Sequence, residues 1–171
     1  MQWIEHFIRH DYEGDWSVIA LRCPPGVTDP AHMITSDPNR SDYADTPVLT
    51  GSPYFRQVLA TFACELHSVR LMRLAPGSSI KEHQDYDLSF EHGMVRIHIP
   101  VLTNTGVDFR LNGTRVAMPA GSCWYLRLSD PHSVANRGAN DRVHLVIDAV
   151  VNEWVAALFE RAAGPASGGA A

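Results

Sequence analysis

The sequence predicts a mainly β protein in which antiparallel strands form a double-stranded β-helix, or jelly roll, with flanking helices. From residue 68 onward, eight short apolar segments follow one another, and turn signals such as Pro76-Gly77 and Asn112-Gly113 separate them. Eight strands at such short intervals fit an eight-stranded jelly roll of the cupin kind. A plain antiparallel sandwich would show the same pattern and stays open at this point.

The chain before these strands divides into an irregular part and a helix. Residues 23–53 are rich in Pro, Asp, Thr and Ser and show little periodicity, so we expect a long irregular segment that could close over a site as a lid. Residues 53–64 carry apolar side chains at helical spacing, which predicts a helix packed outside a sheet.

The eight predicted strands follow, and a helix ends the folded part. This second helix is expected over 152–162, and the small polar residues of 164–171 predict a disordered tail. A single domain over 1–163, with a barrel core at about 68–150, is the simplest organisation for a chain of 171 residues. The strands are predicted at 69–74, 80–83, 94–102, 107–111, 115–118, 123–126, 132–135 and 143–150.

The composition is that of a soluble globular protein, with 45% hydrophobic and 19% charged residues. A formal net charge of −5 gives no general attraction to nucleic acid or to anionic membranes, so neither is expected as a partner. The sequence has no 18-residue apolar run, and charged residues interrupt its start where a signal peptide needs an apolar stretch. Three widely spaced cysteines predict reduced thiols and a cytoplasmic location.

The most informative polar residues are two histidines and an aspartate. His83 and Asp85 are two residues apart, and His132 opens a later predicted strand. Because side chains alternate across a strand, His83 and Asp85 can reach the same ion, whereas Asp87 is expected beyond the strand end. Two imidazoles and one carboxylate form the three-ligand face of non-haem Fe(II) oxygenases, which keep positions open for a co-substrate and O2. We expect these three residues to be catalytic and to bind Fe(II).

Arg142 lies ten residues after His132, where such an enzyme can hold the distal carboxylate of 2-oxoglutarate. A guanidinium presents a planar fork of donors that matches a carboxylate through two hydrogen bonds. The loop 137–141 is expected to turn the chain into an adjacent antiparallel strand, so that His132 and Arg142 share the inward face, provided that the register does not slip by one residue. The predicted cofactors are Fe(II), 2-oxoglutarate as co-substrate, and O2.

The chain also resembles the aspartyl/asparaginyl β-hydroxylase family of Fe(II)/2-oxoglutarate-dependent dioxygenases, which includes bacterial proline cis-hydroxylases. The resemblance covers about residues 69–148 and implies a double-stranded β-helix in which Arg96 and His98 match positions that contact the co-substrate. The animal peptidyl hydroxylases of this family lack the acidic ligand, so Asp85 makes this chain more similar to the bacterial members. The motifs that carry the resemblance are Val69–Gly77, His83–Asp85, Arg96–Pro100, Gly121–Trp124, Pro131–Asn136 and Arg142–Asp148.

The resemblance implies a hydroxylase that acts on a carbon of an amino acid, either free or within a peptide. Aspartyl or asparaginyl β-hydroxylation is the first expectation, and cis-hydroxylation of free L-proline is the second. The alternative from another class is a non-catalytic cupin-like metal-binding module. Such a module would not need Arg142, Arg96 and His98 to converge on a dicarboxylate.

A substrate that carries an amino-acid carboxylate calls for an arginine near the mouth of the site. Arg70 and Arg73 lie on opposite faces of one predicted strand, so only one of them can point inward. Trp124 could form a wall of the pocket. His6 and His144 are expected in structural or surface roles, and a homodimer is expected only as a general tendency of small jelly-roll enzymes.

Overall fold

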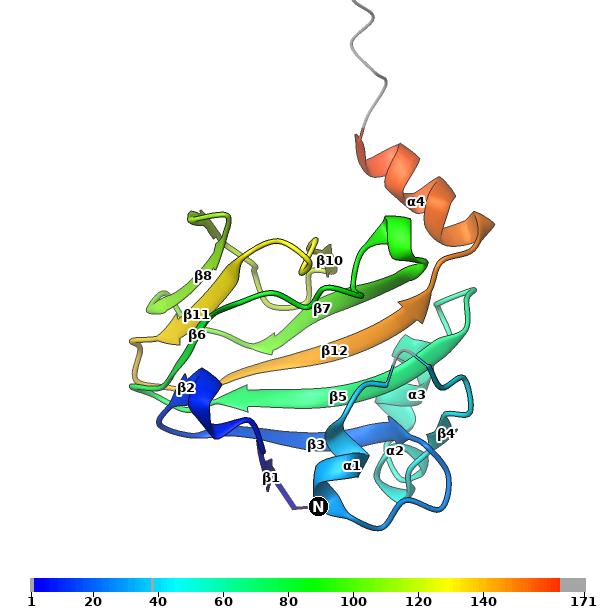
Figure 1. The fold of residues 1–171 in the computed structure, drawn as a ribbon, viewed down its shortest axis with the longest axis horizontal. Helices are drawn as coiled ribbons and strands as arrows, with labels where there is room; N and C mark the ends of the chain where they lie inside the picture. The colour runs from blue at the N-terminus through cyan, green and yellow to red at the C-terminus, as the bar shows by residue number, and fades with distance from the viewer. Residues whose placement is uncertain (1, 38, 164–171) are drawn as a thin grey trace, which may run out of the picture.

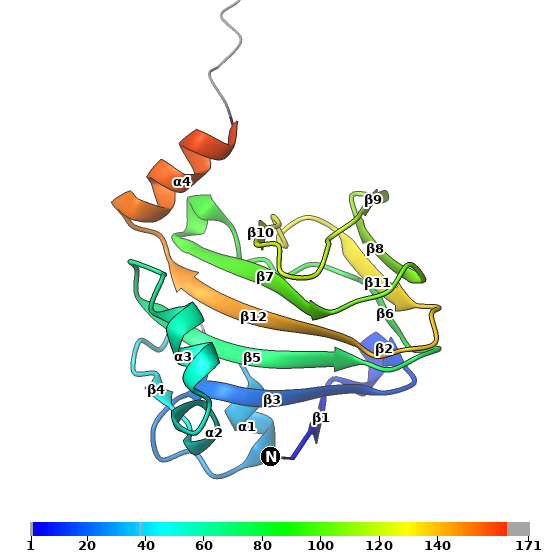
Figure 2. The same ribbon diagram turned by 180° about the vertical axis from the view of Figure 1, so that it is seen from behind.

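Two antiparallel sheets face each other as a sandwich, as Figures 1 and 2 show from opposite sides. This computed structural model describes residues 2–37 and 39–163, so the predicted disordered tail, 164–171, lies outside the described residues. All eight predicted strands are present, and every pairing between the described strands is antiparallel. The prediction of a mainly β, antiparallel fold is confirmed.

The two sheets differ in size. The smaller sheet contains, in spatial order, β2 (Tyr12–Glu13), β6 (Ser79–His83), β11 (His132–Asn136), β8 (Val107–Leu111) and β9 (Thr114–Val116). The larger sheet contains, in spatial order, β1 (Ile4–Glu5), β3 (Trp16–Cys23), β5 (Leu66–Leu74), β12 (Arg142–Val150), β7 (Met94–Leu102) and β10 (Trp124–Tyr125), with β4 (Ala44–Asp45) paired to β3.

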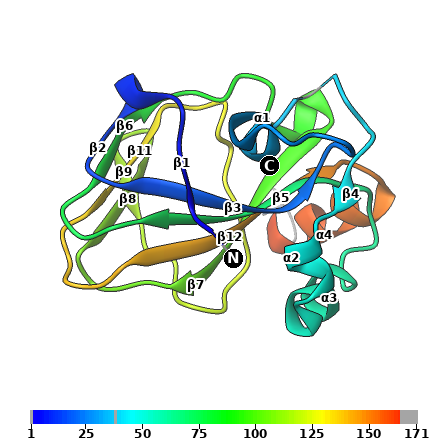
Figure 3. The ribbon, with the colours of Figure 1, turned by 90° about the horizontal axis from the view of Figure 1, so that it is seen from below.

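Strand alternation divides the apolar side chains of the larger sheet between two cores. Val18 and Met72 point between the sheets, where they pack with Val134 from the smaller sheet. Ile19 and Leu71 point to the outer face. This outer core is covered by α2 (Pro47–Thr50), α3 (Pro53–Leu59) and α4 (Glu153–Ala163). Figure 3 shows α2 and α3 on this side of the sheet and α1 (Pro30–Ile34) on the other.

The irregular segment 23–53 contains short elements that the sequence pattern does not reveal. Its first helix, α1, begins at Pro30 after Asp29, whose side chain accepts a hydrogen bond from the backbone of His32. The helices predicted at 53–64 and 152–162 correspond to α3 and α4, although α3 ends at Leu59. Two short 3-10 helices, η1 (Arg9–Asp11) and η2 (Phe90–His92), complete the described helices.

The barrel includes strands before residue 68, so the predicted core of about 68–150 is too short at its start. The strand β3 lies between β1 and β5 in the larger sheet. Its residues from Trp16 to Leu21 are all buried, because helices cover one face and the smaller sheet covers the other. A strand that is buried on both faces lacks the alternation by which strands are recognised in a sequence.

The strands β11 and β12 are not neighbours, contrary to the expected hairpin. β11 pairs with β6 and β8 in the smaller sheet, whereas β12 pairs with β5 and β7 in the larger sheet. The connection 137–141 therefore crosses from one sheet to the other, as connections in a sandwich commonly do. His132 and Arg142 both face the interior, but from opposite sheets.

Among the described residues, no helix combines the length and the apolarity needed to cross a membrane. The three cysteines, Cys23, Cys64 and Cys123, are free thiols.

Candidate metal centre

Three side chains that could hold a metal ion gather at the ends of two neighbouring strands. His83 ends β6 and His132 begins β11, and the two residues are direct partners across this antiparallel pair. Their ring centroids lie 4.2 Å apart. Asp85 follows His83, and one potential ligand atom from each of the three residues lies within 4.8 Å of the others. The structure thus brings the predicted triad together, while Asp87 is exposed outside it.

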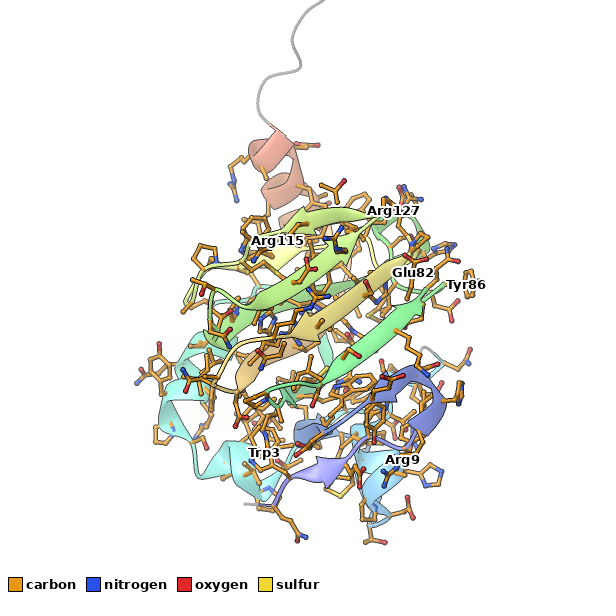
Figure 4. The ribbon with its side chains drawn as sticks, turned by 90° about the vertical axis from the view of Figure 1, so that its left-hand side faces the viewer. Trp3, Arg9, Glu82, Tyr86, Arg115 and Arg127 are labelled. Atoms are coloured by element: carbon orange, nitrogen blue, oxygen red, sulfur yellow. The ribbon has the colours of Figure 1, made fainter. Side chains whose placement is uncertain are left out.

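A β-bulge in β6 turns His83 toward the space between the sheets. Ile80 and His83 are three residues apart on β6, but their partners on β11 are only two residues apart. The extra residue reverses the alternation, so His83 faces the interior with Ile80 while Glu82 is exposed. Figure 4 shows Glu82 on the outer side of the smaller sheet, near Tyr86. The direction of His83 therefore depends on the bulge.

The hydrogen bonds of the two histidines leave one nitrogen of each ring free to bind a metal. His83 Nδ1 lies 2.8 Å from the carbonyl oxygen of Lys81, and His132 Nδ1 lies 3.0 Å from that of Asp130. A carbonyl oxygen only accepts, so both Nδ1 atoms carry the proton and both Nε2 atoms keep a lone pair. Burial lowers the pKa of His132, which favours the neutral ring that a metal requires.

The aspartate of the triad is fixed from both its backbone and its side chain. The Asp85 amide donates to the carbonyl of Leu128 at 2.8 Å, and Asp85 Oδ2 accepts from Arg96 at 2.8 Å. Two imidazole nitrogens and one carboxylate oxygen form the donor set that non-haem Fe(II) sites use, with further coordination positions left open. The residues present therefore fit an Fe(II) ion.

A cavity of about 220 Å³ lies between the two sheets, and the triad forms part of its wall. Buried cationic and polar side chains from the larger sheet face the triad across it. The remaining walls come from the N-terminal segment and from the residues just after α1. The polar residues that line the cavity are His6, Asp11, Thr35, Ser36, Arg70, His83, Asp85, Arg96, His98, His132, Ser133 and Arg142.

Arg142 is a buried cation that has no carboxylate partner among the described residues. The side chain is 2% exposed, its NH2 group donates to His144 Nδ1 at 2.9 Å, and its Nε finds no hydrogen-bond acceptor. Burial lowers the pKa of Arg142 to about 9. A buried charge is costly unless it is paired, so this guanidinium is suited to receive an anion from the cavity.

His144, which the sequence interpretation assigned to a structural role, connects Arg142 to His98. Because Arg142 donates to His144 Nδ1, this nitrogen is an acceptor, and His98 Nδ1 at 3.2 Å donates to it as well. His98 Nε2 is buried without a partner among the described residues. Burial, together with the charges of Arg142 and Arg96, holds the pKa of His98 well below 6.5. The cluster therefore has one cation, Arg142, flanked by two neutral rings.

Arg96 contacts two carboxylates instead of joining Arg142 and His98. Its Nε and NH2 groups donate to Asp148 at 2.6 and 2.9 Å, and its NH1 group donates to Asp85 at 2.8 Å. Burial favours a lower pKa for Arg96, but the charge and hydrogen bonds of Asp148 and the charge of Asp85 outweigh it and raise the pKa. A contact between Arg96 and a co-substrate stays a prediction.

The structure separates the three predicted substrate residues. Arg70 faces the cavity and Arg73 faces the opposite side of β5, as alternation predicts. Arg73 forms ion pairs with Asp15 and Asp141 and does not line the metal cavity, so the structure does not bring it to the candidate site. Trp124 packs against the core between the sheets and does not line the metal cavity either.

Part of the irregular segment reaches the cavity, as a lid would. Ile34, the last residue of α1, lines it together with Thr35 and Ser36, which follow directly. The N-terminal segment contributes His6, whose ring stacks on Trp16 with centroids 3.6 Å apart. The sequence interpretation missed the contribution of the N-terminal segment, which depends on the pairing of β1 with β3.

Comparisons with known proteins identify the family of the chain. The model of the family described as Aspartyl/Asparaginyl beta-hydroxylase matches residues 11–151. The L-proline cis-4-hydroxylase of Rhizobium meliloti (strain 1021) is 27% identical over 137 residues, which are 79% of this chain and 48% of that protein. This chain therefore spans about half the length of that curated relative.

A solved structure supports the fold. The oxidoreductase of the 2OG-Fe(II) oxygenase family from Burkholderia pseudomallei superposes with a TM-score of 0.56 and 15% identity, covering 87% of this chain and 72% of that chain. The jelly-roll prediction is confirmed. Because the family model matches from Asp11 to Val151, across both sheets, the chain belongs to the aspartyl/asparaginyl beta-hydroxylase family.

Proposed function

We propose that the protein is an Fe(II)/2-oxoglutarate-dependent dioxygenase that hydroxylates a carbon of an amino acid or of an amino-acid residue. The observation that carries the proposal is the conjunction, in one cavity, of a two-histidine, one-carboxylate triad and a buried arginine to which no carboxylate of residues 2–37 and 39–163 is paired. A module that only binds a metal would need the triad but not the buried cation. Family membership supports the same activity.

Residues at the smaller sheet would bind the metal, and a residue of the larger sheet would bind the co-substrate. His83, Asp85 and His132 would hold the iron, which with 2-oxoglutarate and O2 supplies the oxidation of a C–H bond to C–OH. Arg142 would bind the distal carboxylate of 2-oxoglutarate, and its fork of donors favours two parallel hydrogen bonds. The apolar side chains around the cavity would exclude water from the reacting atoms.

Two observations favour a small free amino acid as the substrate. The cavity volume of about 220 Å³ is below the range of roughly 300–1,000 Å³ that is typical of small-molecule sites. The relative from Rhizobium meliloti is named for its action on L-proline. We therefore propose L-proline as the first substrate to test, with aspartyl and asparaginyl residues in peptides as the alternative. Arg70 stays the predicted partner of the substrate carboxylate.

The first experiment is an anaerobic titration of the protein with Fe(II) and 2-oxoglutarate, followed by visible absorption. A metal-to-ligand charge-transfer band should form in the wild type, disappear in His132→Ala and weaken in Arg142→Ala. Arg73→Ala, which removes a cation outside the cavity, should leave the band unchanged. Normal metal binding without any band would contradict the proposal and favour a non-catalytic cupin-like module.

The substrate is tested by succinate release in air with the band-forming protein. L-proline should stimulate succinate formation and appear as a hydroxylated product, whereas stimulation only by peptides that contain Asp or Asn would favour peptidyl β-hydroxylation. Free thiols at all three cysteines support the proposal of a reducing, cytoplasmic location. The homodimer stays a prediction.

A further inference from the structure

A buried network of ions stands directly behind the aspartate of the triad. Arg96 donates to Asp85 Oδ2 through NH1 and to both oxygens of Asp148 through Nε and NH2. Asp148 Oδ2 also accepts from Arg70 NH2 at 2.8 Å and from Ser36 Oγ at 2.6 Å. The Asp148 carboxylate thus accepts hydrogen bonds from two arginines and a serine. One of these arginines, Arg96, also donates to the aspartate of the triad.

The network is shielded from water where it contacts Asp148 and is more open at Asp85. The side chain of Asp148 is 0% exposed, that of Arg96 is 11% exposed and that of Asp85 is 29% exposed. Burial disfavours a charged Asp148, but the charges of Arg96 and Arg70 outweigh this effect and hold its pKa far below 3.8. Asp148 therefore stays ionised and fixes the guanidinium of Arg96 from one side.

The contact leaves Asp85 with one oxygen for a metal. Arg96 donates to Asp85 Oδ2, whereas no described residue donates to Oδ1, so Oδ1 keeps its lone pairs for a metal. Asp85 lies beyond the last residue of β6, where no strand pairing restrains its side chain. A carboxylate that binds a metal through one oxygen is commonly held through the other by a hydrogen-bonding partner, and the loss of such a partner costs about 10–100-fold in metal affinity.

We propose that Arg96 is a positioning residue, held by Asp148, that orients the carboxylate of Asp85 for metal binding. The inference rests on the proposed function only in that the triad binds a divalent metal. It differs from the predicted contact between Arg96 and 2-oxoglutarate, because it requires an effect of Arg96 on the metal site when no co-substrate is present.

The loss of the Arg96 charge and the loss of its orienting hydrogen bond should change the metal affinity in opposite directions. Arg70, Arg96, Asp85 and Asp148 together carry no net charge, so loss of the Arg96 charge would leave a negative cluster that attracts a cation more strongly. Loss of its orienting hydrogen bond would weaken metal binding instead. The direction of the change in affinity therefore decides between the two effects.

The test measures Co(II) binding to the full chain without 2-oxoglutarate, by calorimetry and by the visible ligand-field bands of the bound ion. Arg96→Gln removes the charge, and Arg96→Lys keeps the charge but cannot bridge Asp85 and Asp148 with a planar fork. Arg73→Lys is the matched control, because Arg73 also joins two aspartates but lies outside the cavity. Arg96→Lys keeps Asp148 paired and is the variant expected to stay folded.

We expect Arg96→Lys and Arg96→Gln to bind Co(II) about 10–100-fold more weakly than the wild type, with shifted ligand-field bands, and Arg73→Lys to match the wild type. The proposal is overturned if Arg96→Lys keeps both the affinity and the spectrum, or if folded Arg96→Gln binds more tightly. A wild type that binds no Co(II) would instead contradict the proposed function, so the two failures are distinguishable.

Discussion

Replacement of Arg142 by methionine should stabilise the ligand-free protein and at the same time weaken its binding of 2-oxoglutarate. Methionine has a similar length and no charge, so it removes the buried cation without opening a large cavity. Arg142 is 2% exposed, and among the described residues its side-chain hydrogen bond goes to the neutral ring of His144. In the folded protein this positive charge is therefore buried without an opposite charge from the described residues, so a bound anionic ligand would have to neutralise it.

The size of the stabilisation follows from the pKa of Arg142. Burial lowers this pKa from 12.5 to about 9. One pKa unit corresponds to about 1.4 kcal/mol, so the charged form costs the folded protein at most about 5 kcal/mol. Because the folded pKa lies below the unfolded one, this cost is present at neutral pH and declines only as the pH rises from about 9 toward 12.5.

The loss of the hydrogen bond to His144 and of packing around Arg142 offsets part of this gain. We expect a net stabilisation of about 1–2 kcal/mol, which for a chain of this size raises the Tm by about 2–8 °C. In the complex, the same substitution removes a charge-assisted pair with the distal carboxylate. Loss of such a pair costs about 3 kcal/mol, which corresponds to weaker 2-oxoglutarate binding on the order of 100-fold.

Calorimetry of the metal-free protein gives the Tm, and anaerobic titration with Fe(II) and 2-oxoglutarate gives the Kd from the visible band. Arg142→Lys is the matched control. It keeps the buried charge and loses the fork, so it should weaken 2-oxoglutarate binding without raising the Tm. A lower Tm for ligand-free Arg142→Met, or a 2-oxoglutarate Kd unchanged within about threefold, would refute the inference that Arg142 is an unpaired buried charge that binds the anionic co-substrate.

Three further predictions concern the metal, the lid and acid pH. His132→Ala should abolish Co(II) binding, whereas His92→Ala, which changes an exposed histidine, should not; calorimetry checks both. Ser36→Ala removes a 2.6 Å hydrogen bond to a buried carboxylate, so trypsin should cleave after Arg40 up to about tenfold faster while the Tm changes little. The pKa of His6 is lowered from 6.5 to about 4, mainly by burial. As the pH falls below 6.5, His6 is therefore protonated in the unfolded chain at a higher pH than in the folded chain, which favours unfolding. The free energy of unfolding in urea should then fall by at least about 1 kcal/mol between pH 7 and 5, and an equally steep fall in His6→Phe would exclude this histidine as a cause.

The three residues of the candidate metal site could be predicted from the sequence because their chemistry is local. The spacing of His83 and Asp85 and the place of His132 at a strand start need no knowledge of the sheet order. The bulge in β6 could not be predicted, and it is the bulge that points His83 inward. The bridge from Arg96 to Asp148 needs the pairing of β7 with β12, in which these two residues are direct partners although 52 positions separate them. The pairing register of two strands that are so far apart in the sequence cannot be predicted from the local sequence pattern.

A sequence signal for the missed residues exists in β12. The strand alternates between polar and apolar side chains from Arg142 to Leu145, Val146 interrupts the pattern, and a polar residue on the same face returns at Asp148. Such alternation normally predicts a strand with one face in water. In the structure β12 is the central strand between β5 and β7, and Arg142, His144 and Asp148 are all at most 2% exposed. Polar residues on a central strand with both faces covered must face a ligand or one another, because unpaired buried charges are too costly to keep.

The two ends of β12 therefore differ in how their buried charges are paired. Asp148, at the end next to Arg96, finds its partners within the protein, and its pKa is lowered accordingly. Arg142, at the other end, finds no carboxylate among the described residues, and burial lowers its pKa instead. The inward face of one strand therefore carries an anion, Asp148, whose charge is paired within the protein. It also carries a cation, Arg142, whose charge a bound anion would have to pair. Replacement of Asp148 should consequently destabilise the fold and disturb the metal site, whereas replacement of Arg142 should weaken binding of the co-substrate without destabilising the fold.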